Sequence, residues 1–288
     1  MLQARFFNKK LVKLQIFFQK ILDNACVLYI ILVSLQIVNL QFSENSSYKE
    51  KKMAYIRKRQ INNRVLIIQE AARMFVEEGY TKSSINKIAQ TLHLSLGNIT
   101  FYFKTKEHLL AVLVDEMFDY QRRMMDEYVE EGKSSLLAYC LELTAIAAVC
   151  EESEVARDFY ASSYASALTL EKIRKNDTER VKEIFASFQA EWTNEQWVAT
   201  ENIVSGIEYA TIMTREENTP LALQIEKTLD TILYLFGVPQ NIRQAKIQKV
   251  LRVDYRAIGH RLLKEFPEYV RKINAEHVRE EQNKEDKQ

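Results

Sequence analysis

The sequence predicts an all-α protein, with a small N-terminal three-helix domain and a larger helical domain behind it. Helix breakers are scarce, since the 288 residues include only 6 Gly and 3 Pro. Leu, Ile, Ala, Glu, Lys and Gln are abundant, and few segments alternate apolar and polar residues as strands do. Apolar residues make up 47% of the chain, which at this length is enough for two modest hydrophobic cores.

The first segment, residues 1–52, is set apart by its composition. Ala25 to Phe42 is apolar and uncharged, and lysines precede it, as in a signal anchor or a marginal transmembrane helix. A second interpretation fits the sequence better. Met53 begins MAYIRKRQINNR, and Lys49-Glu50 just upstream can be encoded AAG-GAG, which is a ribosome-binding sequence. We therefore expect translation to start at Met53, so that residues 1–52 are a misassigned or disordered extension, with a membrane anchor as the alternative.

Two helices are expected between Asn62 and Leu92. In the first, apolar residues recur at spacings of three and four from Val65 to Phe75, and Gly79 is placed to cap its C-terminus. Ser83 or Ser84 can accept a hydrogen bond from a free backbone N–H and so begin the second helix, INKIAQTL. The apolar residues of this short helix are predicted to pack against the first.

A third short helix follows after a tight turn through His93 and Leu94. Ser95 is its predicted N-cap, and Ile99 and Phe103, four residues apart, face the core. The opposite face and its margins expose small, polar and aromatic side chains, namely Leu96, Gly97, Asn98, Thr100, Phe101 and Tyr102. Two short helices across a tight turn, the second with such a face, are the layout of a helix-turn-helix whose second helix reads the major groove of DNA.

The residue types on this face suit contacts with DNA. Phe101 and Tyr102 cannot be buried beside a third aromatic on one short helix, and an exposed aromatic pair next to basic residues needs a partner. Tyr102 can hydrogen-bond a phosphate, Phe101 can contact a thymine methyl and Asn98 can bond a base edge. Gly97 lets the backbone approach closely, and Lys106 at the start of the next helix adds an ammonium to a phosphate site.

The charges are unevenly distributed along the chain. Residues 53–106 carry nine Lys or Arg against three Glu, a net charge of +6, and residues 1–52 add +5. Because the whole chain has a net charge of +1, residues 107–288 carry −10. A small basic block on a larger acidic body favours one face that binds nucleic acid.

Residues 83–110, SSINKIAQTLHLSLGNITFYFKTKEHLL, resemble the N-terminal domain of TetR-type (TetR/AcrR) transcriptional regulators. The shared features are Ile88-Ala89, Ser95-Leu96-Gly97, Phe101-Tyr102-Phe103 and Lys104-Thr105-Lys106-Glu107. The resemblance implies a DNA-binding domain at residues 53–106. The contacts that it implies come from Ser84, Ser95, Leu96, Asn98, Thr100, Phe101, Tyr102 and Lys106. The sequence departs from the family pattern at Thr100, where many relatives carry Tyr, and this puts one phosphate contact in doubt.

A larger helical domain is predicted at residues 107–270. Successive amphipathic helices are expected at 109–131, 135–150, 153–169, 172–191 and 194–215. Thr219 and Pro220 favour the start of a further helix, which Gly237 and Pro239 end.

The C-terminal part is predicted to hold one more helix and a tail. The helix is expected at 241–264 and should break near Phe266-Pro267, because proline lacks a backbone N–H. Residues 271–288 form a charged tail, which is expected to be disordered from Glu276 onward.

The resemblance also implies a homodimer, since TetR-type proteins dimerise through the last helices of this domain. A homodimer suits two DNA half-sites one helical turn apart. We expect the interface on the helices at 196–215 and 220–236. Its predicted apolar seam consists of Ile203, Ile207, Leu229, Ile232, Leu233 and Phe236.

Many TetR-type relatives hold a small molecule in the same domain, so the resemblance implies a hydrophobic ligand there. The residues that can line its pocket are Tyr139, Phe159, Tyr160, Tyr164, Trp192, Trp197 and Met213. The alternative is that these side chains are ordinary core. The function implied is a repressor that a ligand releases from operator DNA. A TetR-fold regulator with no ligand and a membrane-tethered helical interaction protein are the alternatives.

Other function classes lack their signatures. The sequence contains no GxSxG, no HExxH, no phosphate loop and no Gly-rich dinucleotide turn, so no enzyme and no cofactor is predicted. The four histidines are scattered without a metal-ligand partner at helical spacing, which predicts no metal site. Cys26, Cys140 and Cys150 show no disulfide spacing and favour a reducing cytoplasm.

Overall fold

The structure, a computed structural model, describes residues 13, 52, 62–129, 135–214 and 219–285 of the chain. By their contacts, residues 62–288 group as one compact unit. The expected extension at 1–52 lies outside the described residues apart from Lys13 and Lys52, and so does the expected start at Met53. Both expectations therefore stay predictions.

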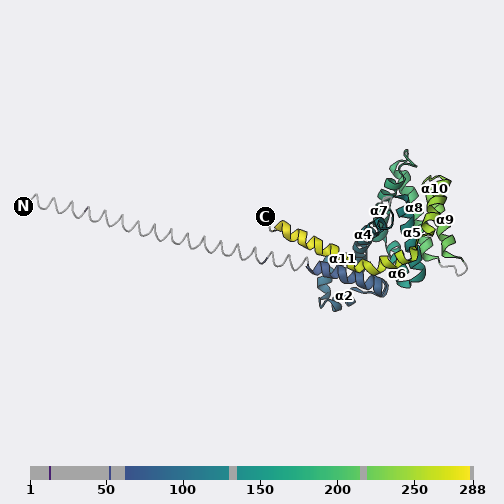
Figure 1. The fold of residues 1–288 in the computed structure, drawn as a ribbon. Coiled ribbons are helices and arrows are strands. Elements are labelled where there is room, and N and C mark those ends of the chain that lie inside the picture. The colour runs from purple at the N-terminus through teal and green to yellow at the C-terminus, as the bar shows by residue number, and fades with distance from the viewer. Residues whose placement is uncertain (1–12, 14–51, 53–61, 130–134, 215–218, 286–288) are drawn as a thin grey trace, which may run out of the picture. The chain divides into compact units, whose positions relative to one another are not determined.

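All regular secondary structure in the described residues is helical, which confirms the predicted all-α class (Figure 1). A helix at 62–77, here called the N-terminal helix, precedes α2 (Ile85–Thr91), α3 (Leu96–Tyr102) and α4 (Lys106–Asp126). The other helices are α5 (Leu136–Glu152), α6 (Glu154–Ala165), α7 (Ala167–Phe185), α8 (Asn194–Met213), α9 (Leu221–Leu235), α10 (Gln240–Leu251) and α11 (Tyr255–Glu285). None of the described helices is long and apolar enough to cross a membrane.

The N-terminal helix, α2 and α3 pack around a shared small core. Ile68, Phe75, Ile88 and Ile99 are fully buried there, on the faces that the apolar spacing predicted. Gly79 follows the N-terminal helix at a φ of 97°, in the left-handed region that glycine adopts without a steric penalty. It is the predicted C-terminal cap of this helix.

The turn between α2 and α3 closes the end of α2. His93 has a φ of 52°. Its N–H donates to the Gln90 carbonyl at 3.2 Å, and the N–H of Leu94 donates to the Ala89 carbonyl at 2.9 Å. These two bonds around a left-handed residue are the pattern of a Schellman cap, which accounts for the sharp turn that the sequence predicted here.

α5 is the central helix of the larger domain. It contacts α4, α6, α8, α9, α10 and α11, and it is apolar on nearly every side, as a helix surrounded by others must be. Cys140 and Cys150 lie on it as buried free thiols. α11 crosses α5 closely at Gly259, where a Cβ would collide with the backbone carbonyl of Ala145.

The chain breaks earlier than predicted between its last two helices. The expected single helix at 241–264 is divided, because α10 ends at Leu251 and α11 begins at Tyr255. The Asp254 carboxylate accepts the N–H of Ala257 at 3.0 Å and so caps the start of α11. This cap is the signal in the sequence that the periodicity alone did not reveal.

α11 does not break at Phe266-Pro267 but continues to Glu285. A proline inside a helix costs about 3 kcal/mol or more. Phe266 and Val270 are fully buried on either side of it, and burying such side chains contributes roughly 1.5–3 kcal/mol each. The burial of these two side chains therefore offsets the free-energy cost of the proline. The tail that was expected to be disordered from Glu276 is helical as far as Glu285, which is a second correction.

Candidate nucleic-acid interface and cavity

The two faces of α3 are clearly divided between core and solvent. Ser95 begins the helix, and its hydroxyl accepts the N–H of Asn98 at 3.2 Å. Ile99 and Phe103 are buried, as predicted. On the other face, 69% of Phe101 and 48% of Leu96 are exposed to solvent. A helix of seven residues thus displays a large aromatic ring on its free side.

The remaining predicted contact residues of α3 lie on the same free side. Gly97, Asn98 and Thr100 are exposed, and Tyr102 is half-buried with its ring edge-on to Phe101 at 4.9 Å between centroids. The Thr100 hydroxyl donates within its own helix, to the carbonyls of Leu96 at 3.2 Å and Gly97 at 3.3 Å. Its oxygen still has a lone pair for an outside donor.

Packing within the chain does not require a glycine at residue 97. A Cβ at this position would have the Ser95 hydroxyl as its nearest neighbour, at 3.9 Å, which is ordinary contact. A glycine that the surrounding structure does not need, on an exposed face, suits the close approach of an outside molecule.

Ser84 and Lys106 are the two predicted contact residues outside α3. Ser84 is exposed and caps α2, since its hydroxyl accepts the N–H of Lys87 at 3.1 Å. The Lys106 ammonium instead turns toward the protein. It donates to the carbonyls of Tyr80 at 3.0 Å and Ser83 at 3.1 Å, and it lies 4.0 Å from the centre of the Tyr80 ring.

These contacts change the role expected for Lys106. An ammonium has three donors, so one donor is left for a phosphate while two hold the loop before α2 against the start of α4. The phosphate contact expected of Lys106 therefore stays a prediction that rests on its third donor. Sequence reasoning missed the two carbonyls because they lie 26 and 23 residues away along the chain.

A second link joins the loop after the N-terminal helix to the larger domain through α6. The Asp158 carboxylate accepts the backbone N–H of Thr81 at 2.7 Å and also accepts the Thr81 hydroxyl. A Cβ on Gly79 would come within 2.9 Å of the same carboxylate. The φ of residue 79 favours glycine, and a larger residue there would also displace the end of the Asp158 side chain. Nothing in the local sequence pattern predicts a pairing over 77 residues.

The larger domain encloses a cavity of about 70 Å³. Its wall comes from α4 to α9, and four of the seven predicted pocket residues line it, namely Tyr139, Phe159, Tyr160 and Tyr164. The other three do not line this cavity, so the prediction that they do is wrong. Trp192 and Trp197 pack edge to face on each other, 4.8 Å apart, near Phe236. Met213 is exposed at the end of α8.

One side of the cavity wall is polar and charged. Arg180 of α7 donates to both carboxylate oxygens of Glu142 of α5, at 2.9 and 2.5 Å. The hydroxyls of Tyr139 and Tyr164 donate to the two oxygens of Glu208 of α8, at 3.2 and 3.0 Å. Burial raises the pKa of Glu208 to about 7, although these two hydrogen bonds oppose the shift. No spacing or motif in the sequence distinguishes these charged residues.

The predicted dimer seam is mostly unavailable to a partner. Leu229, Ile232, Leu233 and Phe236 are buried inside the chain, and the Phe236 ring stacks on Phe185 at 4.3 Å. Of the predicted seam, Ile203 is exposed and Ile207 is half-buried. The correction has a simple cause, because the apolar face of α9 packs against α5, α8 and α10.

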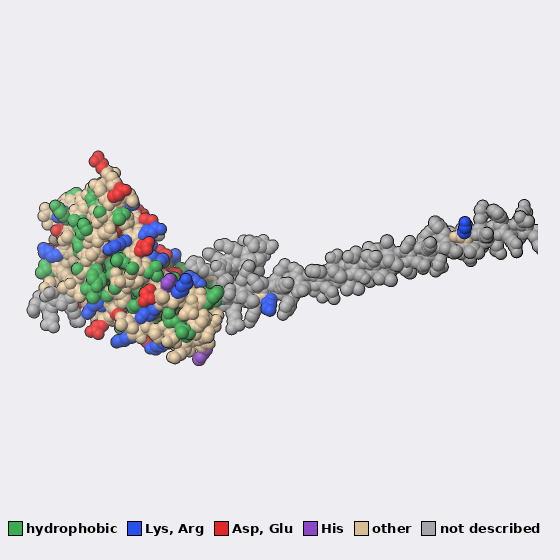
Figure 2. Space-filling model, turned by 180° about the vertical axis from the view of Figure 1, so that it is seen from behind, with side chains coloured by type: hydrophobic (Ala, Val, Ile, Leu, Met, Phe, Trp, Pro, Cys, Tyr) green, Lys and Arg blue, Asp and Glu red, His purple; other side chains and the backbone are tan. Residues whose placement is uncertain are grey.

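Other apolar side chains of α8 and α9 face solvent instead. They are Val198, Tyr209 and Met213 on α8, and Leu223 and Tyr234 on α9. Apolar side chains are also visible in several clusters over the helical body on the face drawn in Figure 2.

Comparison with known proteins finds a family match in the region of the N-terminal helix, α2 and α3. Residues 67–113 match the family model described as bacterial regulatory proteins, tetR family. The "Uncharacterized HTH-type transcriptional regulator YuxN" of Bacillus subtilis (strain 168) is 31% identical over 81 residues. That alignment covers 28% of this chain and 28% of the relative, so well under two thirds of the relative's length is matched.

Two solved structures are similar at low identity. A gamma-butyrolactone receptor (ArpA-like protein) has a TM-score of 0.37 at 18% identity, over 72% of this chain and 99% of its own. The TetR family protein CprB from S. coelicolor A3(2) has a TM-score of 0.32 at 18% identity, over 73% of this chain and 98% of its own.

The matched residues 67–113 run from the N-terminal helix through α2 and α3 into α4, which is the region whose caps, buried face and exposed face are described above. Over this region the chain is similar to the tetR family of bacterial regulatory proteins and to an HTH-type transcriptional regulator.

Proposed function

We propose that the protein is a homodimeric, sequence-specific repressor that releases its operator DNA when a small molecule occupies the cavity. In this proposal residues 53–106 form the DNA-binding domain and residues 107–270 the regulatory and dimerisation domain. The observation that carries it is the exposed face of α3, where 69% of the Phe101 surface is open to solvent beside buried Ile99 and Phe103. An aromatic ring displayed in this way on a recognition helix needs a binding partner.

α3 lies in the major groove in this proposal. Asn98 bonds a base edge, Phe101 contacts a thymine methyl, and Gly97 lets the helix backbone come close. The remaining donor of Lys106 reaches a phosphate. Contacts to the DNA backbone or groove edges come from Ser84, Ser95, Leu96, Thr100 and Tyr102.

Homodimerisation through α8 and α9 is supported by their exposed apolar side chains. Ile203 is 58% exposed, and Tyr234 is 66% exposed. A two-fold axis would bring the same patch of each copy together and bury these side chains against their counterparts. Two DNA-binding domains related by that axis would then meet two half-sites of an operator.

α6 is the element that links ligand and DNA in this proposal. Its residues Phe159, Tyr160 and Tyr164 line the cavity, while Asp158 holds Thr81 in the DNA-binding region. The cavity of about 70 Å³ is smaller than the roughly 300–1,000 Å³ of typical sites for drug-sized ligands. A drug-sized ligand can fit only if the helices around the cavity move apart. It would therefore favour a state in which α6 is displaced and the distance between the two DNA-binding domains of the dimer is changed.

The test is a salt-dependent DNA-binding titration of the full chain. Fluorescence anisotropy would compare the duplex upstream of its own gene with a random duplex of equal length. We expect tight binding to the upstream duplex and weaker, more salt-sensitive binding to the random one. Weak and equal binding to both at every salt concentration would contradict the proposal.

A further inference from the structure

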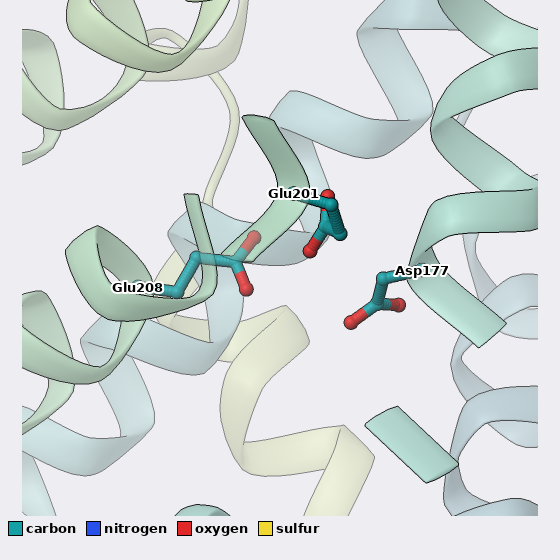
Figure 3. A group of neighbouring side chains, drawn as sticks. All are labelled: Asp177, Glu201 and Glu208. Atoms are coloured by element: carbon teal, nitrogen blue, oxygen red, sulfur yellow. The ribbon is translucent and has the colours of Figure 1, made fainter. Parts of the chain in front are cut away.

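Three acidic side chains converge between α7 and α8, beside the cavity. Asp177 comes from α7, and Glu201 and Glu208 come from α8, where a spacing of seven residues puts both on one face. Figure 3 shows the three carboxylates pointing toward one another. One oxygen from each lies within 4.8 Å of the oxygens of the other two.

Glu201 is the member of this cluster that the chain leaves without a partner. Its relative exposure is 1%, and neither of its carboxylate oxygens has a hydrogen-bond partner among the described residues. Burying an ionised carboxylate costs several kcal/mol unless a cation or donors compensate it. An acidic side chain held in such a place, and aimed at two others, calls for a positive charge between them.

Arg180, the cation that acts most strongly on Asp177 and Glu201, is already engaged. Arg180 donates to both oxygens of Glu142, in a two-pronged pair that neutralises each of them. Glu208 receives hydroxyl donors from Tyr139 and Tyr164, which orient it but bring no charge. Arg122 and Arg174 also act on the cluster, but Arg122 is paired with Asp119 and Arg174 is exposed to solvent. The three clustered carboxylates therefore lack a cation held between them.

The surroundings of the cluster disfavour the charged form of its carboxylates. Burial, followed by the charges of Glu208 and Asp177, raises the pKa of Glu201 to about 10. Burial and the charge of Glu208 likewise raise the pKa of Asp177 well above its ordinary value.

We propose that Asp177, Glu201 and Glu208 bind one divalent cation of the oxygen-preferring class, Mg²⁺, Mn²⁺ or Ca²⁺. Carboxylate oxygens are the ligands that these ions select, whereas the softer metals favour imidazole or thiolate. Metal–oxygen distances are about 2.0–2.1 Å for Mg²⁺ and about 2.3–2.6 Å for Ca²⁺. Two oxygens bound to one ion therefore lie at most about 4.2 Å apart for Mg²⁺ and about 5.2 Å apart for Ca²⁺. Oxygens within 4.8 Å of one another can close on one ion after small movements of the side chains, which are larger for Mg²⁺ than for Ca²⁺.

The surroundings supply what a metal site needs beyond its ligands. Tyr139 and Tyr164 fix the orientation of Glu208 from outside, as outer hydrogen-bond partners of metal ligands do. Asp177 and Glu208 also line the cavity, so water in the cavity can fill coordination positions that the three carboxylates leave open. The inference concerns ion binding alone and stands whether or not the protein binds its own upstream DNA.

The direct test is a Mn²⁺ titration of the full chain, freed of metal with a chelator and followed by electron paramagnetic resonance. Free Mn²⁺ gives a strong six-line signal that weakens on binding. We expect the signal to be lost up to one equivalent per chain and to return when excess Mg²⁺ or Ca²⁺ competes. A signal that rises in proportion to the added ion from the start would overturn the proposal.

Variants assign the binding to these residues. Glu201→Gln and Asp177→Asn each remove a ligand while keeping its shape, and Tyr164→Phe removes an outer donor. We expect Tyr164→Phe to weaken Mn²⁺ binding by roughly 10–100-fold and the two ligand variants to weaken it further. Glu179→Gln, an exposed carboxylate on the same helix α7, is the matched control and should bind as the wild type does. Equal binding by Glu201→Gln and the wild type would overturn the assignment.

A measurement on the unaltered chain covers the case in which a variant fails to fold. An ion that binds only the folded state raises the thermal midpoint of unfolding as its concentration rises. We expect Mn²⁺, Mg²⁺ or Ca²⁺ to raise the midpoint of the metal-free wild type, and a monovalent salt of equal ionic strength to leave it lower. No rise with any of the three ions would count against the site.

Discussion

Gly97 and Lys106 show at the scale of single residues how a side chain's surroundings separate a structural role from a binding role. The structure leaves room for a Cβ at Gly97, so the absence of a side chain there serves binding of an outside molecule rather than folding. The Lys106 ammonium donates to the carbonyls of Tyr80 and Ser83, so part of its role is to stabilise the fold. The two residues therefore respond differently to substitution by alanine.

Gly97→Ala is expected to fold normally and to bind DNA poorly. Alanine in place of glycine in a helix raises the free energy of unfolding by about 0.5–1 kcal/mol. The added methyl group should hold α3 away from the groove and weaken operator binding by about tenfold, or 1.4 kcal/mol. Urea unfolding and anisotropy titration measure the two effects. Unchanged DNA affinity would mean that the backbone does not approach DNA at this point.

Lys106→Ala is expected to lower both stability and DNA binding. The loss of hydrogen bonds from a charged donor should reduce the free energy of unfolding by about 1.5–3 kcal/mol. Binding to operator and to random DNA should weaken alike, with a smaller dependence on salt. Asn98→Ala is the comparison, since it should change base preference by about 1–3 kcal/mol at one position and leave stability alone. The division of roles fails if both variants lose operator and random DNA equally.

At the scale of helices, what the sequence could predict was the local part of each element. The caps at Ser84, Ser95 and Gly79 depend on neighbours three or four residues away, and the structure has all three. Periodicity also located the apolar face of α9 correctly. It could not tell that this face packs inside the chain rather than on a second copy, because both environments select the same residues.

The passage of α11 through Pro267 is the element whose stability is easiest to test. Proline there removes one backbone hydrogen bond and crowds the preceding turn, but the buried Phe266 and Val270 keep the helix together. Pro267→Ala should therefore raise the free energy of unfolding by up to about 3 kcal/mol. The midpoint of urea unfolding reports this. A loss of stability would mean that the proline fits its place better than an unbroken helix does.

At the scale of the whole molecule, the contacts that matter for function join segments far apart in sequence. Asp158 meets Thr81 across 77 residues. The carboxylates of Asp177 and Glu208 meet across two helices, beside a cavity that six helices enclose. Histidine spacing along the chain could not reveal this cluster, because only the packing of α7 on α8 brings its acidic residues together.

Asp158→Ala is expected to loosen the DNA-binding region from α6. Without the carboxylate, the Thr81 N–H loses its acceptor, and hydrogen exchange in residues 79–84 should become faster. Hydrogen exchange in α5 should not change, because the burial of α5 does not depend on the contact between Asp158 and Thr81. Glu154→Ala, an exposed acidic residue on the same helix, is the control. Equal exchange in residues 79–84 of both variants would show that the Asp158 contact does not hold this loop.

The central helix α5 carries a reporter of how often the larger domain opens. Burial raises the pKa of both Cys140 and Cys150 to about 12, so near neutral pH almost no thiolate exists there, and alkylating reagents cannot reach the sulfur atoms. Each covalent label on these thiols must then record one opening of the helical body. The rate of their modification therefore measures how often the helical domain opens. Any ligand or ion bound between the helices should lower this rate.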